Sequence, residues 1–398
     1  MRIAAWKRGA VFTGTAITVL LLCSGCGLTY LLHAISGELR LLNNAVPLET
    51  ALQEDGLRPE ERYRLRLVRR IKAFGEKDLG LRKTHSYETV YMASSRRPLY
   101  VVSAAPRDRL RPVTWWFPVV GRMPYLGFFD RDRAWKEKER LEKKGLDTLM
   151  SRADAFSTLG WFGDPLTLNL VKGGTVDLAE TLLHEMTHAT LYVRGEGEFN
   201  EGLAVLVGMT GAFRFFRKIL GETHPFTLEA KRSIHDERLF SEFLSGLLAR
   251  LDRLYRSPVS YREKMTGRER IFADALRDFA RLESRFETRR YSGFGRGGLN
   301  NAYLLTVGLY HRNFNLFEAV LEKNGNSIRK TLQFFRRLAG EPGGMLEKTR
   351  KRLGWTRAAG PRIPQEAGGG KCRSTKDRMA SGYRGVRLQS LWPASGPT

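Results

Sequence analysis

Two histidines four residues apart, His184 and His188, provide the clearest chemical signal in the chain. Residues at this spacing lie on one face of an α-helix, so both imidazoles can bind a single metal ion. Glu185, on the same turn, is placed to hold or deprotonate a water bound to that ion. A catalytic zinc needs three protein ligands and one open position. Glu201, which we expect on a second helix, is the candidate for the third ligand.

The residues around this motif favour a buried helix. The three residues before it and the three after it carry no charge, which avoids desolvating a charge inside a domain. Asp177 and Glu180 predict the start of the helix, as an N-cap and an acid at its third position. Gly195 and Gly197 are expected to end the helix and let the chain turn back. The alternative, a chance motif on an ordinary amphipathic helix, is disfavoured by these uncharged neighbours.

Composition allows a large core and sets limits on partners. A chain of 398 residues that is 42% hydrophobic can bury one large domain or two smaller ones. The net charge of +25 could favour anionic lipid or nucleic acid. However, the basic residues are spread along the chain, and no helix-turn-helix, RNA-binding or zinc-finger pattern is present. We therefore expect a basic solvated surface and no nucleic-acid partner. The central region has no cysteine, which excludes a disulfide or a thiolate metal site there.

The first residues have the pattern of a targeting segment. Residues 1–25 are typical of a bacterial lipoprotein signal peptide, with a basic start, an apolar run and small residues before Cys26, which would carry the lipid. Cys23 stands where leucine is usual. The alternative is an uncleaved membrane anchor, because residues 9–37 carry no charge and are long enough to span a bilayer.

Two further residues bear on location. Lys7 and Arg8 favour the cytoplasmic side, so the catalytic part would lie across the membrane. Gly27, directly after Cys26, is not the aspartate that retains lipoproteins at the inner membrane in some bacteria, which favours the outer membrane. We therefore expect a protein of the bacterial cell envelope that is lipid-anchored and faces the periplasm.

Hydrophobic periodicity predicts a short β-containing part followed by helices. Helices are expected over residues 38–52, 58–74 and 130–144, and strands at 88–93, 99–104 and 113–120. Beyond Glu201 the pattern is mainly helical and includes a helix that reaches from 299 to 311. Five residues there are core candidates at helical spacing: Ile271, Phe272, Ala275, Leu276 and Phe279.

The fold class that these patterns indicate is α+β and mainly helical, with a small β-sheet and a helical C-terminal half. One domain is expected over residues 26–359, followed by a disordered basic tail at 360–398. Residues 155–165 predict a loop before the zinc helix. This loop either lines a substrate cleft or forms a turn packed by Trp161.

The segment Phe199-Asn200-Glu201-Gly202-Leu203-Ala204 resembles the NEGxA segment that carries the third zinc ligand in aminopeptidase N-like gluzincins. In those enzymes the second histidine and this glutamate are further apart in sequence. They also hold the free amine of the substrate with an upstream GxMEN segment, which this chain lacks before His184. This resemblance therefore implies a zinc peptidase without specifying an exopeptidase.

Several other segments resemble a family known as the putative aminopeptidases of bacterial lipoprotein type. The similar segments lie between residue 26 and about residue 338, and they are 26–30, 117–121, 156–162, the core at 184–204, and 299–302. The resemblance implies a zincin-like metallopeptidase domain that cleaves peptides or proteins. In that reading zinc, bound by His184, His188 and Glu201, lowers the pKa of its water toward neutrality. Glu185 takes the proton as general base and passes it to the leaving amine.

The resemblance to gluzincins also implies a second donor for the developing oxyanion, commonly a tyrosine or histidine on a later helix. Tyr303, Tyr310 and His311 are the candidates. We prefer Tyr303, because it follows the Asn300-Asn301 pair.

Two other classes of function stay open. One is a non-catalytic, membrane-anchored envelope scaffold or binding protein with a structural metal or none. A structural zinc would need four protein ligands, and residues 184–201 offer no cysteine and no third histidine. The other is a charge-driven binder of membranes or nucleic acid, which would show steeply salt-dependent binding.

Overall fold

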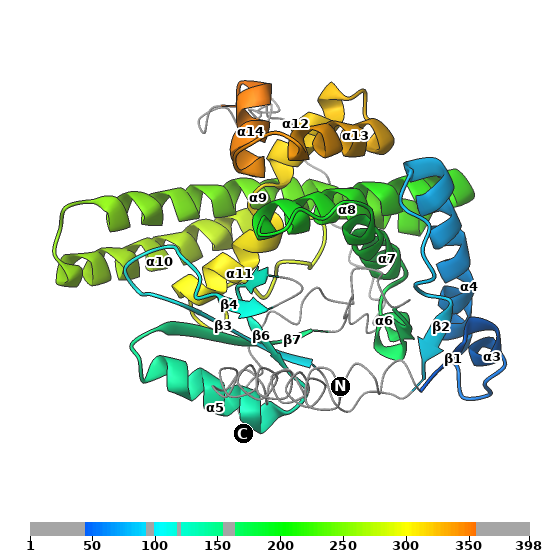
Figure 1. The fold of residues 1–398 in the computed structure, drawn as a ribbon, viewed down its shortest axis with the longest axis horizontal. Coiled ribbons are helices and arrows are strands. Elements are labelled where there is room, and N and C mark those ends of the chain that lie inside the picture. Colours follow the sequence, from blue (N-terminus) through cyan, green and yellow to red (C-terminus); the bar gives the residue numbers. More distant parts are fainter. Residues whose placement is uncertain (1–43, 93–98, 118–120, 154–163, 356–398) are drawn as a thin grey trace, which may run out of the picture.

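The computed structural model describes residues 44–92, 99–117, 121–153 and 164–355 (Figure 1). The fold is α+β and mainly helical, which confirms the expected class. The expected signal peptide, Cys26, most of the loop at 155–165 and the basic tail lie outside the described residues, so these stay predictions. None of the described helices has both the length and the apolar composition that crossing a bilayer requires.

A small mixed sheet forms the N-terminal edge of the described structure. Strand β1 (Ala45–Pro47) pairs antiparallel with β2 (Thr89–Tyr91), which pairs in parallel with β8 (Leu166–Thr167). The helix predicted over 38–52 is therefore shorter in its described part, where only α3 (Leu48–Leu52) is helical. Pro47 accounts for the difference, because a proline disfavours the helical conformation of the residue before it.

Helix α4 (Pro59–Phe74) agrees with the helix predicted over 58–74 and continues into a π-helical turn, η1 (Gly75–Leu79). Its start has a proline in the first turn, and the Glu61 carboxylate accepts from the backbone N–H of Arg58 at 3.0 Å. Helix α4 packs against α7 (Thr175–Thr190), so it supports the helix that carries the two histidines.

A second, antiparallel sheet has the strand order β6–β3–β7. Its strands are β6 (Leu126–Phe128), β3 (Leu99–Ala105) and β7 (Asp147–Ala153), and helix α5 (Arg131–Glu142) covers one face. Val102 and Met150 face α5, whereas Leu149 faces the helices on the other side. Strand β7 is not among the predicted strands, because its sequence, DTLMSRA, has neither the strict polar–apolar alternation nor the continuous apolar run that indicates a strand. Strands β4 (Trp115–Phe117) and β5 (Gly121–Met123) form a separate antiparallel pair, so the described residues contain three small sheets, where one was expected.

Helices make up the C-terminal half, as expected. In chain order they are α6 (Leu168–Lys172), α7, α8 (Gly197–Leu220), α9 (Pro225–Arg256), α10 (Tyr261–Glu283), α11 (Asn301–His311), α12 (Phe314–Lys323), α13 (Ile328–Ala339) and α14 (Met345–Leu353). Figure 1 shows α9 running across the molecule with α10 folded back beside it. The three helices α12, α13 and α14 lie on one side of α9, and the second sheet with α5 lies on the other.

The described core has a large cluster around α4, α7, α8 and α13, a second one between α9, α10 and α11, and a small third one between α5 and the second sheet. Of the five core candidates on α10, Phe272, Ala275 and Phe279 are buried in the second cluster. Leu276 is 39% exposed, and Ile271 is half-buried. Residues 272, 275 and 279 share one helical face, and the other two candidates lie at its edges.

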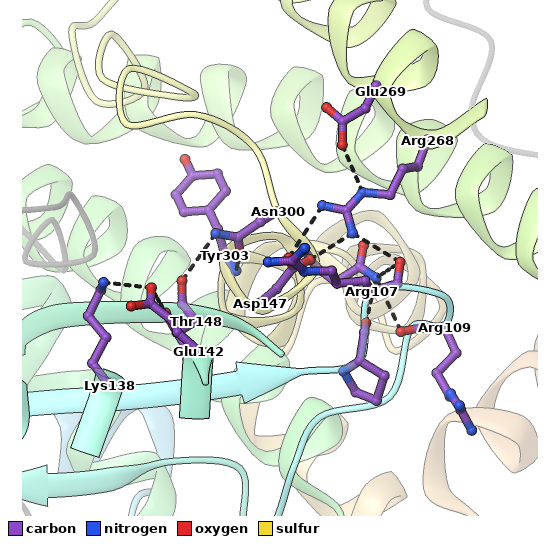
Figure 2. A network of polar contacts seen from close by, with 12 residues as sticks. Arg107, Arg109, Lys138, Glu142, Asp147, Thr148, Arg268, Glu269, Asn300 and Tyr303 are labelled. Atoms are coloured by element: carbon purple, nitrogen blue, oxygen red, sulfur yellow. Dashed lines mark hydrogen bonds and ion pairs between the residues drawn. The ribbon is translucent and has the colours of Figure 1, made fainter. Parts of the chain in front are cut away.

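Two asparagines, Asn300 and Asn301, dock the start of α11 onto the second sheet. Figure 2 shows Asn300 close to Tyr303 and Thr148. The side chain of Asn300 caps the helix by accepting from the backbone N–H of Tyr303 at 2.9 Å. The backbone N–H of Asn301 donates to Asp147 Oδ2 at 2.9 Å, and its amide donates to three backbone carbonyls after β3. Asp147 is also paired with the buried Arg268 at 3.0 Å. These contacts hold α11 in register with β7, and they position the far end of α11.

Candidate metal centre

Helices α7 and α8 pack against each other more extensively than any other pair of elements. Gly208 lies at the point of closest approach. A Cβ atom at this glycine would lie 2.6 Å from the carbonyl oxygen of Glu180 and 3.3 Å from the Cβ of His184. Glu201 is seven residues before Gly208, two helical turns away on the same face of α8. The missing side chain at 208 therefore lets the two helices come close enough for Glu201 to reach α7.

The ends of α7 differ from the sequence-based expectation. The helix begins at Thr175 with Gly174 as N-cap, so Asp177 lies inside the first turn and is not the cap. Glu180 lies in the next turn, where its carboxylate pairs with Arg290. The helix ends at Thr190, before the two glycines that were expected to end it. Gly195, with φ of +83°, turns the connection, and Gly197 is the first residue of α8.

Asn200 explains why the chain leaves the helix early. Its side chain accepts from the backbone N–H of Val193 and donates to the carbonyl oxygen of the same residue, both at 2.8 Å. This two-point contact keeps residues 191–196 out of helical conformation and ties them to the first turn of α8. The asparagine next to Glu201 thus fixes the position from which that carboxylate approaches α7.

The side chains of His184, His188 and Glu201 meet at the crossing of α7 and α8. Their ligand atoms lie within 4.8 Å of one another, the only such group among the described residues. The Nε2 atoms of the two histidines are 3.1 Å apart. The Oε2 atom of Glu201 is 3.2 Å from Nε2 of His184 and 3.4 Å from Nε2 of His188.

This triangle has the dimensions of a zinc site. Ligands bound tetrahedrally at about 2.0–2.1 Å are separated by roughly 3.3–3.5 Å. Two neutral imidazoles and one carboxylate are also ligand types that zinc prefers, and three protein ligands leave one position open. The Nδ1 atoms of both histidines are buried and have no hydrogen-bond partner among the described residues. The Nε2 atoms, in contrast, face each other and Glu201 at the shared centre.

The three groups also perturb one another electrostatically. Burial would raise the pKa of Glu201, but the two imidazoles, His188 foremost, outweigh it and hold that pKa far below its ordinary value. Burial would lower the pKa of His188, but Glu201 and then Glu185 oppose it, and the net pKa is raised. In the absence of metal the centre therefore holds a proton on the histidine side and a negative charge on Glu201, the arrangement that a divalent cation would displace.

Glu185 lies between the two histidines on α7 and is partly exposed. No described residue forms a hydrogen bond with its carboxylate, so the carboxylate is available for proton transfer. Tyr87 lies within its electrostatic range: burial and then Glu185 raise the pKa of the Tyr87 hydroxyl well above its ordinary value. Tyr87 has an uncommon φ of +65°, and its backbone N–H donates to the carbonyl oxygen of Asp164 at 2.8 Å.

The structure brings Tyr310 to the centre and does not bring Tyr303 there. The Tyr310 ring stacks against the His184 imidazole, with 6.3 Å between centroids and 29° between planes. Burial, followed by Glu201, Tyr125 and Glu185, raises the pKa of Tyr310 well above its ordinary value, so its hydroxyl stays protonated and can donate.

Tyr303, the preferred oxyanion candidate, is buried in the second core cluster, where its ring packs against Phe294. Its hydroxyl accepts from the backbone N–H of Gly295. Tyr303 and Tyr310 are two turns apart, about 10.5 Å along the helix axis, so only one of them can lie at the metal centre. His311 is also turned away, because its Nδ1 bonds to the buried carboxylate of Glu237 at 2.9 Å.

Three tyrosines near the centre have no counterpart in the sequence analysis. Tyr87 is close enough to Glu185 for that carboxylate to raise its pKa, and Tyr125 similarly raises the pKa of Tyr310. The Tyr192 ring packs edge-on against the His188 ring, with 6.3 Å between centroids. Tyr192 has one local signal, because it continues the four-residue spacing of the histidines. Tyr87 and Tyr125 have none, since they come from segments far from α7 in sequence.

Comparison with known proteins gives one result that bears on this site. A family profile described as "Putative aminopeptidase" matches residues 29–351, which contain α7, α8 and every candidate ligand. Searches of curated proteins and of solved structures gave no match.

Proposed function

We propose that this chain, which belongs to the putative aminopeptidase family, is a zinc-dependent peptidase that hydrolyses peptide bonds in the bacterial cell envelope. The observation that supports it most directly is the triangle of ligand atoms from His184, His188 and Glu201, with sides of 3.1–3.4 Å. Its dimensions and ligand types suit zinc with one open position. That open position is what distinguishes a catalytic zinc from a structural one.

Each of the four side chains has a defined role in the proposed reaction. His184, His188 and Glu201 would hold the zinc, which when bound would lower the pKa of a coordinated water toward neutrality. Glu185, which no described residue binds, takes the proton as the water attacks the peptide carbonyl. Glu185 then gives this proton to the amine of the leaving group.

Tyr310 is the residue we assign to the developing oxyanion. Its hydroxyl stays protonated at neutral pH, and its ring stacks on His184. A preorganised neutral donor in a buried site stabilises negative charge that appears only in the transition state. This assignment replaces Tyr303, which lies in the second core cluster.

Zinc content and peptide cleavage test the proposal together. The purified protein should contain one zinc and cleave members of a quenched peptide library, and a chelator should abolish the cleavage. His184→Ala and Glu201→Ala should lose the zinc in elemental analysis. Full zinc occupancy in Glu201→Ala would instead assign the third ligand to Glu196 or Glu198. Cleavage that is unaffected by the chelator would show that the zinc mechanism is wrong.

Glu185→Gln separates catalysis from metal binding. The substitution keeps the shape of the side chain but removes the base, so zinc content should stay at the wild-type level while hydrolysis is lost. Retained turnover in this variant would remove Glu185 as the base. Peptides with free and with blocked N-termini, compared on the wild-type protein, distinguish an exopeptidase from an endopeptidase.

The cell-envelope part of the proposal depends on Cys26. If the lipid on Cys26 anchors the protein, Cys26→Ser should release it from the membrane fraction or leave it unprocessed. A Cys26→Ser protein that fractionates and migrates like the wild type would favour the uncleaved anchor.

A further inference from the structure

Besides Nδ1 of His188, two buried polar atoms close to the metal centre have no hydrogen-bond partner among the described residues: Nδ1 of His184 and Oε1 of Glu180. Both residues are 3% exposed. They are four positions apart on α7, so they lie on the same face one turn from each other. A side chain on a helix leans toward the N-terminus, which directs the His184 ring over the turn that holds Glu180.

The chemistry of these two atoms is complementary. With Nε2 turned toward the metal centre, the neutral His184 imidazole carries its proton on Nδ1, which must then donate. Metal-bound histidines almost always donate this second N–H to a carboxylate, a carbonyl or water. Oε1 of Glu180 is an acceptor without a donor. The two groups also interact electrostatically: burial raises the pKa of Glu180, and Arg290 and His184 act against it.

The rest of the Glu180 side chain is held firmly in place. Its Oε2 atom accepts from the guanidinium of Arg290, which also lies 3.5 Å from Asp177. Arg290 belongs to a loop that Asp236 organises from α9. The Asp236 carboxylate is fully buried and accepts from the backbone N–H groups of Glu287 and Thr288 at 2.8 and 2.7 Å. Arg290 therefore fixes one carboxylate oxygen of Glu180 and leaves the other for His184.

We propose that Glu180 is a positioning residue for the metal centre: one bridging water accepts from Nδ1–H of His184 and donates to Oε1 of Glu180. A water between the two atoms would satisfy both of these buried groups, which native structures rarely leave unpaired. Glu180 would then hold the imidazole in the orientation that presents Nε2 to the metal. Arg290 acts one step further out, by holding Glu180. This inference depends on the proposed function, because the ligand that it serves is the zinc.

Zinc affinity, measured by competition with a chromogenic chelator, tests the inference without any assay of activity. Glu180→Gln keeps the size of the side chain but removes the charge that attracts the Nδ1 proton. Zinc affinity should fall by about 10- to 100-fold, the usual effect of losing a group that orients a metal ligand. Asp177→Asn is the matched control, because Asp177 faces the same guanidinium from the same helix but has no metal ligand one turn after it. Its zinc affinity should equal that of the wild type.

A double variant separates positioning from simple stability. Glu180→Gln also removes the negative charge that pairs with the buried Arg290 guanidinium, so the single variant is expected to lose stability. Glu180→Gln combined with Arg290→Met removes both charges and should recover much of that stability in denaturant unfolding. If Glu180 positions His184, zinc affinity stays low in the double variant. If Glu180 serves only the ion pair, zinc affinity returns together with stability, and the inference is wrong.

The outcomes distinguish this inference from the function on which it depends. A wild-type protein that binds zinc, with a Glu180→Gln variant that binds it equally well, would overturn the role of Glu180 and leave the zinc peptidase intact. A wild-type protein that binds no zinc would overturn the proposed function itself.

Discussion

At the scale of single residues, chemical type and helical spacing identify the candidate metal ligands and oxyanion donors. The packing of the helices decides which of these side chains come together. His184 and His188 share a helical face whatever the rest of the fold does. Tyr303 and Tyr310 are both on one face of α11, and only Tyr310 stacks on His184. The two tyrosines differ in their position along the helix axis, and local sequence patterns do not predict which position lies at the metal centre.

The two tyrosines make a matched pair for mutation. Tyr310→Phe should lower kcat by about 100- to 1,000-fold, the usual effect of removing one oxyanion donor, while zinc content stays unchanged. Tyr303→Phe should leave kcat unchanged and cost about 1 kcal/mol of stability, because its hydroxyl, which accepts from a backbone N–H at 3.4 Å, lies in the second core cluster. Steady-state kinetics and denaturant unfolding measure both effects. The reverse result, with kcat lost in Tyr303→Phe, would return the oxyanion role to Tyr303.

At the scale of elements, the candidate site is a crossing of two helices. Asn200 shortens the connection between α7 and α8, and Gly208 allows their backbones to approach. Helix α11 is added from the other side by Asn300 and Asn301, which dock its start on the second sheet. The site thus depends on residues that would not bind the metal themselves but set the distances between the helices.

Gly208→Ala tests the helix crossing. Its Cβ would lie 2.6 Å from the carbonyl oxygen of Glu180, which is backbone and cannot yield without moving α7. We expect a loss of about 1–3 kcal/mol in stability and weaker zinc binding, because Glu201 moves away from the histidines. Gly246→Ala on α9 is the control: nothing lies within 4 Å of its Cβ, so it should gain about 0.5–1 kcal/mol in unfolding free energy. Wild-type zinc affinity in Gly208→Ala would rule out close packing as the requirement.

At the scale of the whole molecule, the candidate site lies where two hydrophobic clusters meet. The cluster around α4, α7, α8 and α13 contains the helices with the ligands. The cluster between α9, α10 and α11 contains Tyr303, Leu304 and Val307, whereas Tyr310 at the end of α11 packs on the first cluster. Helix α11 therefore spans both clusters, and the proposed oxyanion donor stays at the ligands only while the clusters remain packed together.

The ion pair between His188 and Glu201 should give the zinc-free protein a characteristic pH dependence. The pKa of Glu201 is lowered from 4.5, so its contribution to stability is complete above that pH and is lost as pH falls. The pKa of His188 is raised from 6.5, so its contribution is complete below that pH and is lost as pH rises through the raised value. In chelator, the stability difference between wild type and Glu201→Gln should be largest from pH 4.5 to 6.5.

Zinc should reverse the alkaline side of this dependence, because it binds the neutral form of His188. Thermal unfolding with and without zinc, from about pH 4 to 8, measures both effects. Stabilisation by zinc should grow as pH rises above 6.5, the ordinary pKa of the histidine. A difference between wild type and Glu201→Gln that does not change with pH would show that the pair is not formed.

The fold was accessible from sequence where local rules apply. Periodicity predicted α4, α5, α11 and the strands β2, β3 and β4 near their observed positions. It missed β7 and extended the first helix through residues 45–47, where Pro47 and the pairing with β2 favour a strand. The helix start assigned to Asp177 was wrong, because capping signals do not distinguish a cap from a residue within the first turn.

Residue types and their spacing were enough to identify the side chains that could act, because helix geometry alone puts His184 and His188 on a common face. The partners that these side chains meet could not be read from the spacing. The contacts of Tyr310 and Tyr87 with the centre and the pairing of Glu180 with Arg290 join segments up to 126 residues apart. Such contacts depend on how closely whole helices pack and on where they cross. A helical pattern shows which side chains share a face, and packing determines what that face meets.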